Sequence, residues 1–383
     1  MNTAPRFDPY PLHRAPSISG WFAIGALLLV LIVTFFEMFG EPLDWRFFGH
    51  PYGLMILIWI GLFLWLPPFL FIVLFYRLNR HNAQCYAETS QQIQRDWWIR
   101  HRQTVALVEA VLVGGGCGDP EHRQTLFNAD HQPPAPEIAP DGATLRLLQV
   151  FGDDVVERER QLAKLLVLQW QAQRLETGPL QPLACYWQGS LPAWQAFVEQ
   201  MGETFAQVQL PEQPETWQGM GSLDSIIDRT QGAPANALIL CAGCQSLSPR
   251  PDSRLPAGEA AVLWLFGPEG DVRFSRGEWF DANTERLPTV AERALQQSEI
   301  TSPPKVCVSF SQPDAPGLSA HGWNTKQNVQ DANFGDLEGL QAMVAQTLAA
   351  WYVKQHQVPC AWLANDPHHT LALGIVKPDD SIN

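Results

Sequence analysis

Two cysteines are spaced so that they could carry redox or metal chemistry. Cys241 and Cys244 form a Cys-x-x-Cys motif, which occurs in redox pairs and in halves of zinc sites. A zinc site needs four donors, and no second pair with ligand spacing accompanies this one. The motif also ends the apolar run Ala237–Cys241, where cysteine serves as a small apolar residue. We expect a structural role and no metal or cofactor, with redox and metal roles as the alternatives.

Carboxylates and imidazoles form two further groups. His368 and His369 follow Asp366 in an expected turn between the last two strands. A metal site is the alternative there, although Asp366 is the only third donor nearby. Asp153 and Asp154 lead directly into a helical pattern, so they are expected to cap that helix and supply first-turn charge.

Two long uncharged segments lie near the N-terminus. Ala15 to Phe36 and Pro51 to Tyr76 contain no charged residue. Each exceeds the roughly 20 residues that a helix needs to cross a hydrocarbon core about 30 Å thick. We therefore expect two transmembrane helices, over about residues 18–38 and 52–76, and a lipid bilayer as partner.

The basic residues around these segments predict their orientation. Arg6 and Arg14 precede the first segment, and Arg77 and Arg80 follow the second. The link from Glu37 to His50 carries three acidic residues and one arginine. The positive-inside rule then places both termini in the cytoplasm of a bacterial, multi-pass inner-membrane protein.

Composition limits the classes of partner. The net charge of −14 argues against nucleic acid, because binding a phosphate backbone needs a basic face. Seven cysteines without framework spacing are most simply free thiols in a cytoplasmic domain. The chain has 15 tryptophans, and among them Trp194, Trp217 and Trp323 are candidate anchors for a protein partner.

The rest of the chain divides into two expected parts after an anchor of residues 1–81. Arg77 to about Leu112 has a helical pattern, and Gly114 to Gly142 is rich in Gly, Pro, Asp and His. Residues 82–142 are therefore expected to form a juxtamembrane helix and loop, and residues 143–383 an α/β domain.

Apolar runs and helical patterns alternate over this last part, which predicts a layered α/β domain with mixed sheets and no evident internal repeat. The expected strands are Leu145–Phe151, Leu183–Trp187, Ala237–Cys241, Ala260–Phe266, Val272–Ser275, Val306–Phe310, Cys360–Ala364 and Thr370–Val376. The expected helices are Val155–Leu175, Leu191–Phe205, Ser222–Arg229, Thr289–Glu299 and Leu337–Gln355.

The order of these elements resembles the thiolase fold, in its β-ketoacyl synthase branch. Gly219 to Leu247 resembles the family's nucleophile turn, central helix and following strand. Leu255 to Leu265 resembles the strand that opens the second half, and Asn333 to Ala342 resembles the Gly-His-Thr-Gly-Ala-Ala turn. The last two expected strands fall where that fold closes. The resemblance implies a thiolase-like layered architecture.

The resemblance also implies catalytic residues that this chain lacks. The family's nucleophilic cysteine falls on Met220, and a thioether cannot be acylated. The second catalytic histidine falls on Asp336, whose carboxylate cannot act as a neutral imidazole on a thioester carbonyl. His321 is a poor counterpart of the first histidine. These two degenerate positions, Met220 and Asp336, predict a pseudoenzyme without condensing activity.

Membrane-anchored proteins without catalytic residues resemble accessory proteins of bacterial type VI secretion clusters, with the type VI lipase adaptors as the nearest comparison. That resemblance implies a non-catalytic scaffold or adaptor for an effector or a secretion component, and thiolase-fold proteins are commonly homodimers. One alternative is an acyl-thioester or lipid-processing enzyme with a nonstandard active site. Another is an envelope or immunity-type protein that works through its spans and the short link outside the membrane.

A reporter fused after Asn383 tests the predicted orientation. A fused green fluorescent protein should fluoresce, and a fused alkaline phosphatase should be inactive, because the cytoplasm prevents the disulfides that this phosphatase needs. The same fusions inserted in the link between the two spans serve as the reciprocal control. Phosphatase activity at the C-terminal fusion would place the large domain outside the cytoplasm.

Overall fold

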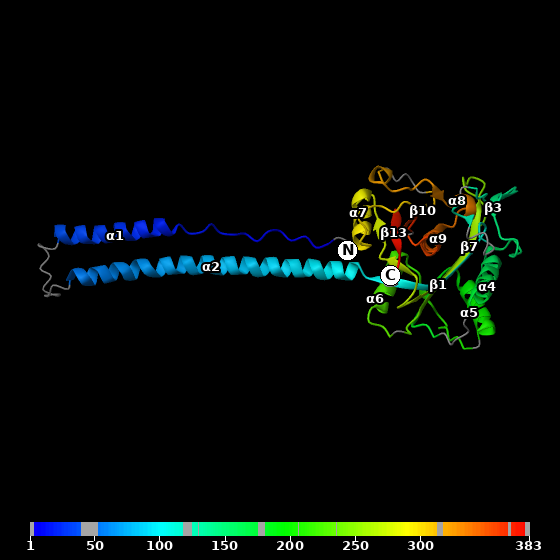
Figure 1. Cartoon of the computed structure of the whole chain (residues 1–383), viewed down its shortest axis with the longest axis horizontal. Helices are drawn as coiled ribbons and strands as arrows, with labels where there is room; N and C mark the ends of the chain where they lie inside the picture. Colours follow the sequence, from blue (N-terminus) through cyan, green and yellow to red (C-terminus); the bar gives the residue numbers. More distant parts are fainter. Residues whose placement is uncertain are drawn as a thin grey trace. The chain divides into compact units, whose positions relative to one another are not determined.

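The computed structural model describes residues 4–39, 53–117, 125–128, 130–174, 181–205, 207–234, 236–311, 317–366 and 369–379. Most of the predicted link between the spans and His368 lie outside these residues. The chain forms two compact units, which meet in sequence between Trp98 and Ile99 (Figure 1).

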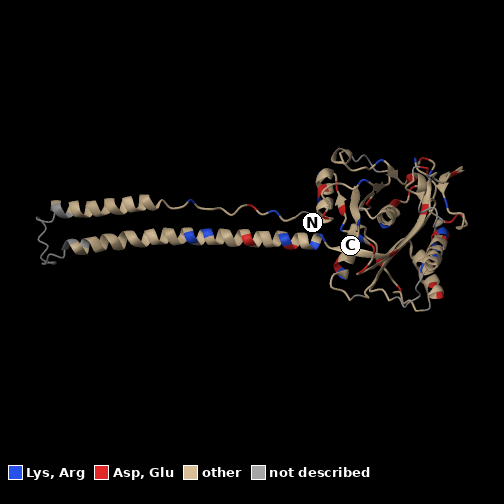
Figure 2. Cartoon of the chain, viewed as in Figure 1, with Lys and Arg blue, Asp and Glu red and all other residues tan. Residues whose placement is uncertain are grey.

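The N-terminal unit contains two helices that are long and apolar enough to cross a membrane, α1 (Ile18–Phe39) and α2 (Gly53–His101). Figure 2 shows that charge appears on α2 only in its second half, from Arg77 onward. The helices approach closely at glycines: a Cβ on Gly61 would lie 2.5 Å from Ile32 Cδ1. Small residues at a contact permit such close helix packing in membranes. The two candidate spans are thus present as helices, and their insertion into a bilayer stays a prediction.

The helix expected to continue to Leu112 ends at His101, so that part of the prediction is wrong. Residues Thr104–Gly114 form strand β1 instead, which pairs with another strand along most of its length. The segment is rich in β-branched valine, and its burial in a sheet outweighs its modest helical pattern. The region expected to be loop contains strands as well, β2 (Glu137–Ala139) and β3 (Gly142–Leu145).

The second unit is an α/β domain built on a mixed sheet, which confirms the predicted fold class (Figure 1). Its other strands are β4 (Ala184–Gln188), β5 (Glu215–Thr216), β6 (Ile239–Ser246), β7 (Ala257–Gly267), β8 (Val272–Ser275), β9 (Glu278–Phe280), β10 (Cys307–Ser309), β11 (Asn328–Val329), β12 (Cys360–Ala364) and β13 (Leu371–Pro378). Its helices are α4 (Val155–Gln173), α5 (Leu191–Thr204), α6 (Met220–Thr230), α7 (Leu287–Gln297), α8 (Asp331–Phe334) and α9 (Gln341–His356), with 3-10 turns at Ser319–His321 and Glu338–Leu340.

The sheet contains an internal duplication that the sequence did not reveal. One half has the strand order β5-β4-β6-β7-β1, and the other has the order β11-β10-β12-β13-β8. In each half the first three strands are parallel and the last two pairings are antiparallel. By this correspondence α6 and α9 occupy equivalent places, each directly before the third strand. The two halves therefore share one topology.

Strand β1 joins the two half-sheets. It pairs with β7 from Ala106 to Gly114 on one edge and with β8 from Thr104 to Leu107 on the other. The connection from β7 to β8 crosses β1, where a Cβ on Gly270 would lie 2.5 Å from the Leu107 carbonyl oxygen. Glycine is therefore required at this crossing, because any side chain would meet the backbone of β1.

The side chains sort into five layers. Along β7, Trp264 and Phe266 belong to the core around α6 and α9, whereas Leu263 and Leu265 belong to the core around α4 and α5. Strand β12 alternates in the same way between the middle layer and α7. Helices α6 and α9 are thus enclosed between the half-sheets, with helices covering both outer faces. Helix α9 is buried on nearly all sides, which is typical of a helix enclosed by protein.

A buried ion pair connects α4 to the sheet. Arg158 and Glu259 have side chains 4% and 0% exposed, and Arg158 Nη2 lies 2.7 Å from Glu259 Oε1. Arg158 Nε donates to the other carboxylate oxygen at 2.9 Å, which makes the pair bidentate. Glu259 also accepts hydrogen bonds from the Leu147 amide and the Ser246 hydroxyl. Each charge is therefore compensated only while its partner is present.

We expect Arg158→Ala to destabilise the protein by about 3–5 kcal/mol, because it leaves the Glu259 carboxylate buried without its cation. Arg160→Ala on the same helix is the control, since the Arg160–Glu157 pair is about half exposed and should contribute less than about 1 kcal/mol. Urea unfolding of the full-length protein in detergent, followed by tryptophan fluorescence, measures both. Equal effects of the two substitutions would contradict this assignment.

Candidate functional site

Helix α6 begins at Met220, inside the middle layer, after a glycine with a positive φ. Gly219 has φ +57°, and a Cβ there would lie 2.9 Å from Asp366 Oδ2. Only glycine satisfies both conditions easily, so the carboxylate of Asp366 packs against the turn that opens α6. The helix start therefore meets the segment that follows β12.

Met220 fills the space at the start of α6. Its side chain is 2% exposed, and a Cβ on Gly277 would lie only 2.0 Å from Met220 Sδ. The same Cβ would lie 3.2 Å from the ring of Trp362. The thioether thus packs on the bare backbone of Gly277 beside an indole. A thioether carries no ionisable proton and no acylable group, so the role of the Met220 side chain is packing.

The carboxylate that packs against this turn also binds an imidazole. His369 Nδ1 is 2.8 Å from Asp366 Oδ1, and the His369 ring stacks on Trp279 with centroids 5.1 Å apart. The Asp366 side chain is 4% exposed and that of His369 31%. With Nδ1 donating to the carboxylate, Nε2 is the atom that could take up a proton, as in a general base. The spacing Asp-x-x-His was visible in the sequence, where it was interpreted as a turn.

Asp336 lies on the loop before α9 and has a structural role. Its backbone amide donates to the Pro256 carbonyl at 2.8 Å, and its carbonyl accepts from the Gly258 amide at 3.0 Å. Its carboxylate accepts from the Glu338 amide at 3.1 Å and lies 3.4 Å from Arg250 Nη2. These contacts fasten the loop to the start of β7 and occupy the carboxylate.

The two predicted degenerate positions, Met220 and Asp336, border the same segment after β12. Gln341 donates to Asp336 Oδ1 at 3.5 Å and accepts from Asn365 Nδ2 at 3.0 Å, and Asp366 then contacts the turn before Met220. His321 lies elsewhere, on the turn Ser319–His321, where its Nδ1 is 2.8 Å from the Gly317 carbonyl oxygen. The arrangement therefore offers one oriented imidazole and one buried thioether.

One further carboxylate in the neighbourhood has a shifted pKa. Glu278 precedes Trp279 in β9, and burial raises its pKa to about 7, against the opposing effect of hydrogen bonds from Arg293 and Gln297. Glu278 is 0% exposed and lies toward α7, on the outer side of the second half-sheet. It stabilises the contact of β9 with α7.

The Cys-x-x-Cys motif does not form a thiol pair. Cys241 and Cys244 lie three residues apart on β6, so Cys241 faces the middle layer and Cys244 faces α4. Both are free, and burial raises the pKa of each well above its usual value. Among the described residues, no group of three or more His, Cys, Asp or Glu gathers as a metal site would require.

The three tryptophans predicted as partner anchors belong to the core, and that prediction is wrong for all of them. Trp194, Trp217 and Trp323 are 1%, 6% and 3% exposed. Trp194 packs against Trp187 and donates to the Glu212 carbonyl at 3.0 Å. The five-layer arrangement has enough interior to bury these rings. The size of that interior depends on tertiary packing and is not evident from the sequence.

Comparison with solved structures finds ketosynthase proteins and OleA. The ishigamide ketosynthase/chain length factor matches with a TM-score of 0.49 and 14% identity, over 72% of this chain and 99% of the other. A ketosynthase domain of oxazolomycin from Streptomyces albus gives 0.46 and 12%, over 72% and 95%. OleA of Xanthomonas campestris with cerulenin gives 0.40 and 11%, over 72% and 99%. No protein-family model and no curated protein matches the chain. At such identities the likeness concerns the fold and says nothing about the role of any residue.

We expect Gly277→Ala to destabilise the protein by about 1–3 kcal/mol, because the new methyl overlaps the Met220 thioether. In a Met220→Ala background the same change should cost clearly less, since the overlapping sulfur is gone. A double-mutant cycle of urea unfolding measures the coupling. Additive effects would show that Met220 does not pack on Gly277.

Proposed function

We propose that this chain is a membrane-anchored, thiolase-like protein that binds a protein partner and does not catalyse condensation. The observation that carries the proposal is the start of α6, where a buried thioether occupies the place that the sequence resemblance assigns to a nucleophilic thiol. A covalent acyl intermediate needs a thiolate, a hydroxyl or another nucleophile at that position.

The thiols elsewhere in the sheet do not replace this nucleophile. Burial raises the pKa of Cys185 and of Cys307 to about 12, and that of Cys360 well above its usual value. Cys241 and Cys244 are shifted in the same direction for the same reason. A buried thiol with a raised pKa is mostly protonated at neutral pH and therefore a weak nucleophile.

The spans and the charge distribution support a tethered binding role. Two apolar helices would hold the α/β unit at an inner membrane, with both termini in the cytoplasm by the positive-inside rule. The partner class that the sequence resemblance suggests is a type VI secretion effector or component, and a homodimer is the suggested assembly. The net charge of −14 disfavours nucleic acid as the partner.

A second function is favoured by one specific observation, the Asp366–His369 pair beside the start of α6. An imidazole oriented by a carboxylate could activate a water molecule against an acyl thioester without a covalent intermediate. This alternative is an acyl-thioester hydrolase with a nonstandard active site, and it makes His369 indispensable.

Incubation with octanoyl-coenzyme A separates these functions. The full-length Cys85→Ser variant in detergent removes the exposed thiol, so that intact mass should show no acyl adduct and free coenzyme A should not exceed the uncatalysed amount. The matched control is the same variant with the further substitution Met220→Cys, which introduces a thiol at the helix start. An adduct without that change, or thioester cleavage that His369→Gln abolishes, would overturn the non-catalytic proposal.

A further inference from the structure

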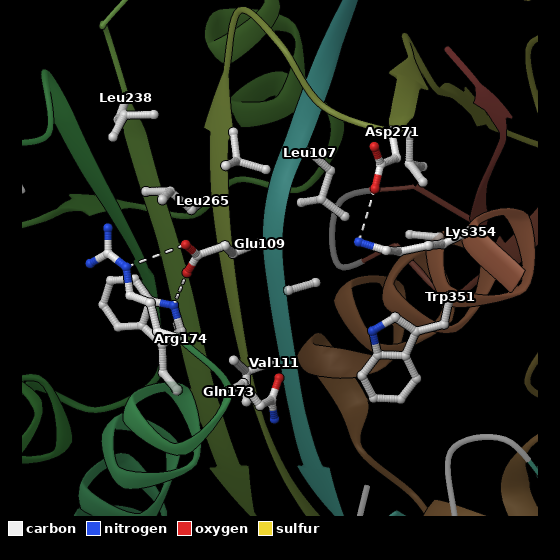
Figure 3. Close-up of a pocket in the computed structure, with 15 residues that line it drawn as sticks. Leu107, Glu109, Val111, Gln173, Arg174, Leu238, Leu265, Asp271, Trp351 and Lys354 are labelled. Carbon is white, nitrogen blue, oxygen red and sulfur yellow. Dashed lines mark hydrogen bonds and ion pairs between the residues drawn. The ribbon is translucent and has the colours of Figure 1, made fainter. Parts of the chain in front are cut away.

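A cavity of about 630 Å³ lies where β1 leaves the second half-sheet (Figure 3). Five consecutive residues of β1, Leu107 to Val111, line it. Consecutive side chains of a strand point to opposite faces, so a cavity that touches all five meets the edge of the strand. Figure 3 shows the same arrangement, with Glu109 and Arg174 on one side of β1 and Trp351 and Lys354 on the other.

The edge of β1 at this cavity has no strand partner among the described residues. One edge of β1 is paired with β7 as far as Gly114, whereas pairing with β8 on the other edge stops at Leu107. The pairing of β1 with β7 has a register irregularity between Leu107 and Glu109, and Val108 is 37% exposed. An unpaired strand edge presents amide and carbonyl groups that can pair with another chain.

Hydrogen-bond donors without acceptors lie on the α4 side of the cavity. Arg174 Nη1 and Gln173 Nε2 are buried and have no hydrogen-bond partner among the residues that the structure describes. Arg174 is 11% exposed, lies over the ring of Trp170 at 5.1 Å, and has its Nε 3.3 Å from Glu109 Oε1. Trp170 Nε1 donates to the same carboxylate, so Glu109 is already engaged. A buried donor without a partner is costly, and an incoming carboxylate would satisfy it.

The α9 side of the cavity adds a cation and apolar surface. Lys354 Nζ lies 3.0 Å from Asp271 Oδ2, and its side chain is 62% exposed. Leu107, Val272 and Ala350 supply apolar wall between the two charged groups. The cavity therefore combines an open strand edge, apolar contact area and two cations, of which one has unused donors.

We propose that the free edge of β1 takes up an extended peptide segment of the partner protein as an added strand, with a carboxylate of that segment bound by Arg174. Leu107 to Val111 spans about 13 Å at 3.3 Å per residue, enough to pair with four or five residues. Main-chain pairing supplies affinity in this mode, and side-chain pockets supply specificity. The inference rests on the proposed function and deepens it by naming where the partner binds and what chemistry it presents.

Selection from random heptapeptide libraries on the full-length protein in detergent tests this site. One library ends in a free carboxylate and the other continues into the carrier protein, which separates a C-terminal carboxylate from an acidic side chain. Peptides enriched on the wild type should carry a carboxylate at a fixed position and bind about tenfold more weakly to Arg174→Met. Arg160→Met is the matched control, with an exposed arginine on the same helix, and should bind normally.

Hydrogen exchange of the bound complex locates the peptide. An enriched peptide should protect amides within residues 108–111, and its N-methylated form should not bind, because it cannot form the hydrogen bonds of a strand pair. Lys354→Met changes an exposed residue, so it provides a second variant should Arg174→Met unfold. No enrichment, protection elsewhere, or displacement by palmitate would overturn the proposal, the last by showing a lipid site. The thioester assay tests the non-catalytic function independently of these peptide experiments. The proposed function and the proposed peptide site can therefore fail separately.

Discussion

The architecture of the α/β unit depends on one strand that two half-sheets share. Because β1 pairs with β7 on one edge and with β8 on the other, the halves are held together by backbone hydrogen bonds as well as by side-chain packing. The crossing of β1 by the β7–β8 connection requires the bare backbone of Gly270. Beyond Leu107 the second pairing stops, because β8 begins at Val272, and the edge of β1 lies open at the cavity.

The enclosure of α6 and α9 follows from this joint. Two half-sheets of the same topology cover the helices from both sides, so the start of α6 lies in the interior and its first side chain must be compatible with packing. Met220 satisfies this requirement against Gly277 and Trp362. Nearby, Asp366 pairs with His369 and packs against the turn before the helix. The start of α6 thus combines a buried thioether with a nearby Asp–His pair.

Local patterns predicted the parts that depend on local physics. The alternation of apolar runs and helical patterns predicted the α/β class. The length of the two segments without charged residues identified the two candidate spans. The helix expected to run to Leu112 failed because the valines of β1 gain more from pairing with β7 than from helical continuation. The prediction that Trp194, Trp217 and Trp323 are surface anchors was wrong because the three rings are buried, and burial depends on tertiary packing.

The sequence by itself determined the fold class, the apolar N-terminal helices and the methionine that begins α6, since each follows from residue identity or short periodicity. Only the tertiary structure revealed the duplicated topology, the separation of Cys241 from Cys244 on opposite faces, the Asp366–His369 pair and the open edge of β1. Their physical cause is pairing between residues distant in sequence. Such pairing depends on which strands become neighbours, and no local pattern encodes that choice.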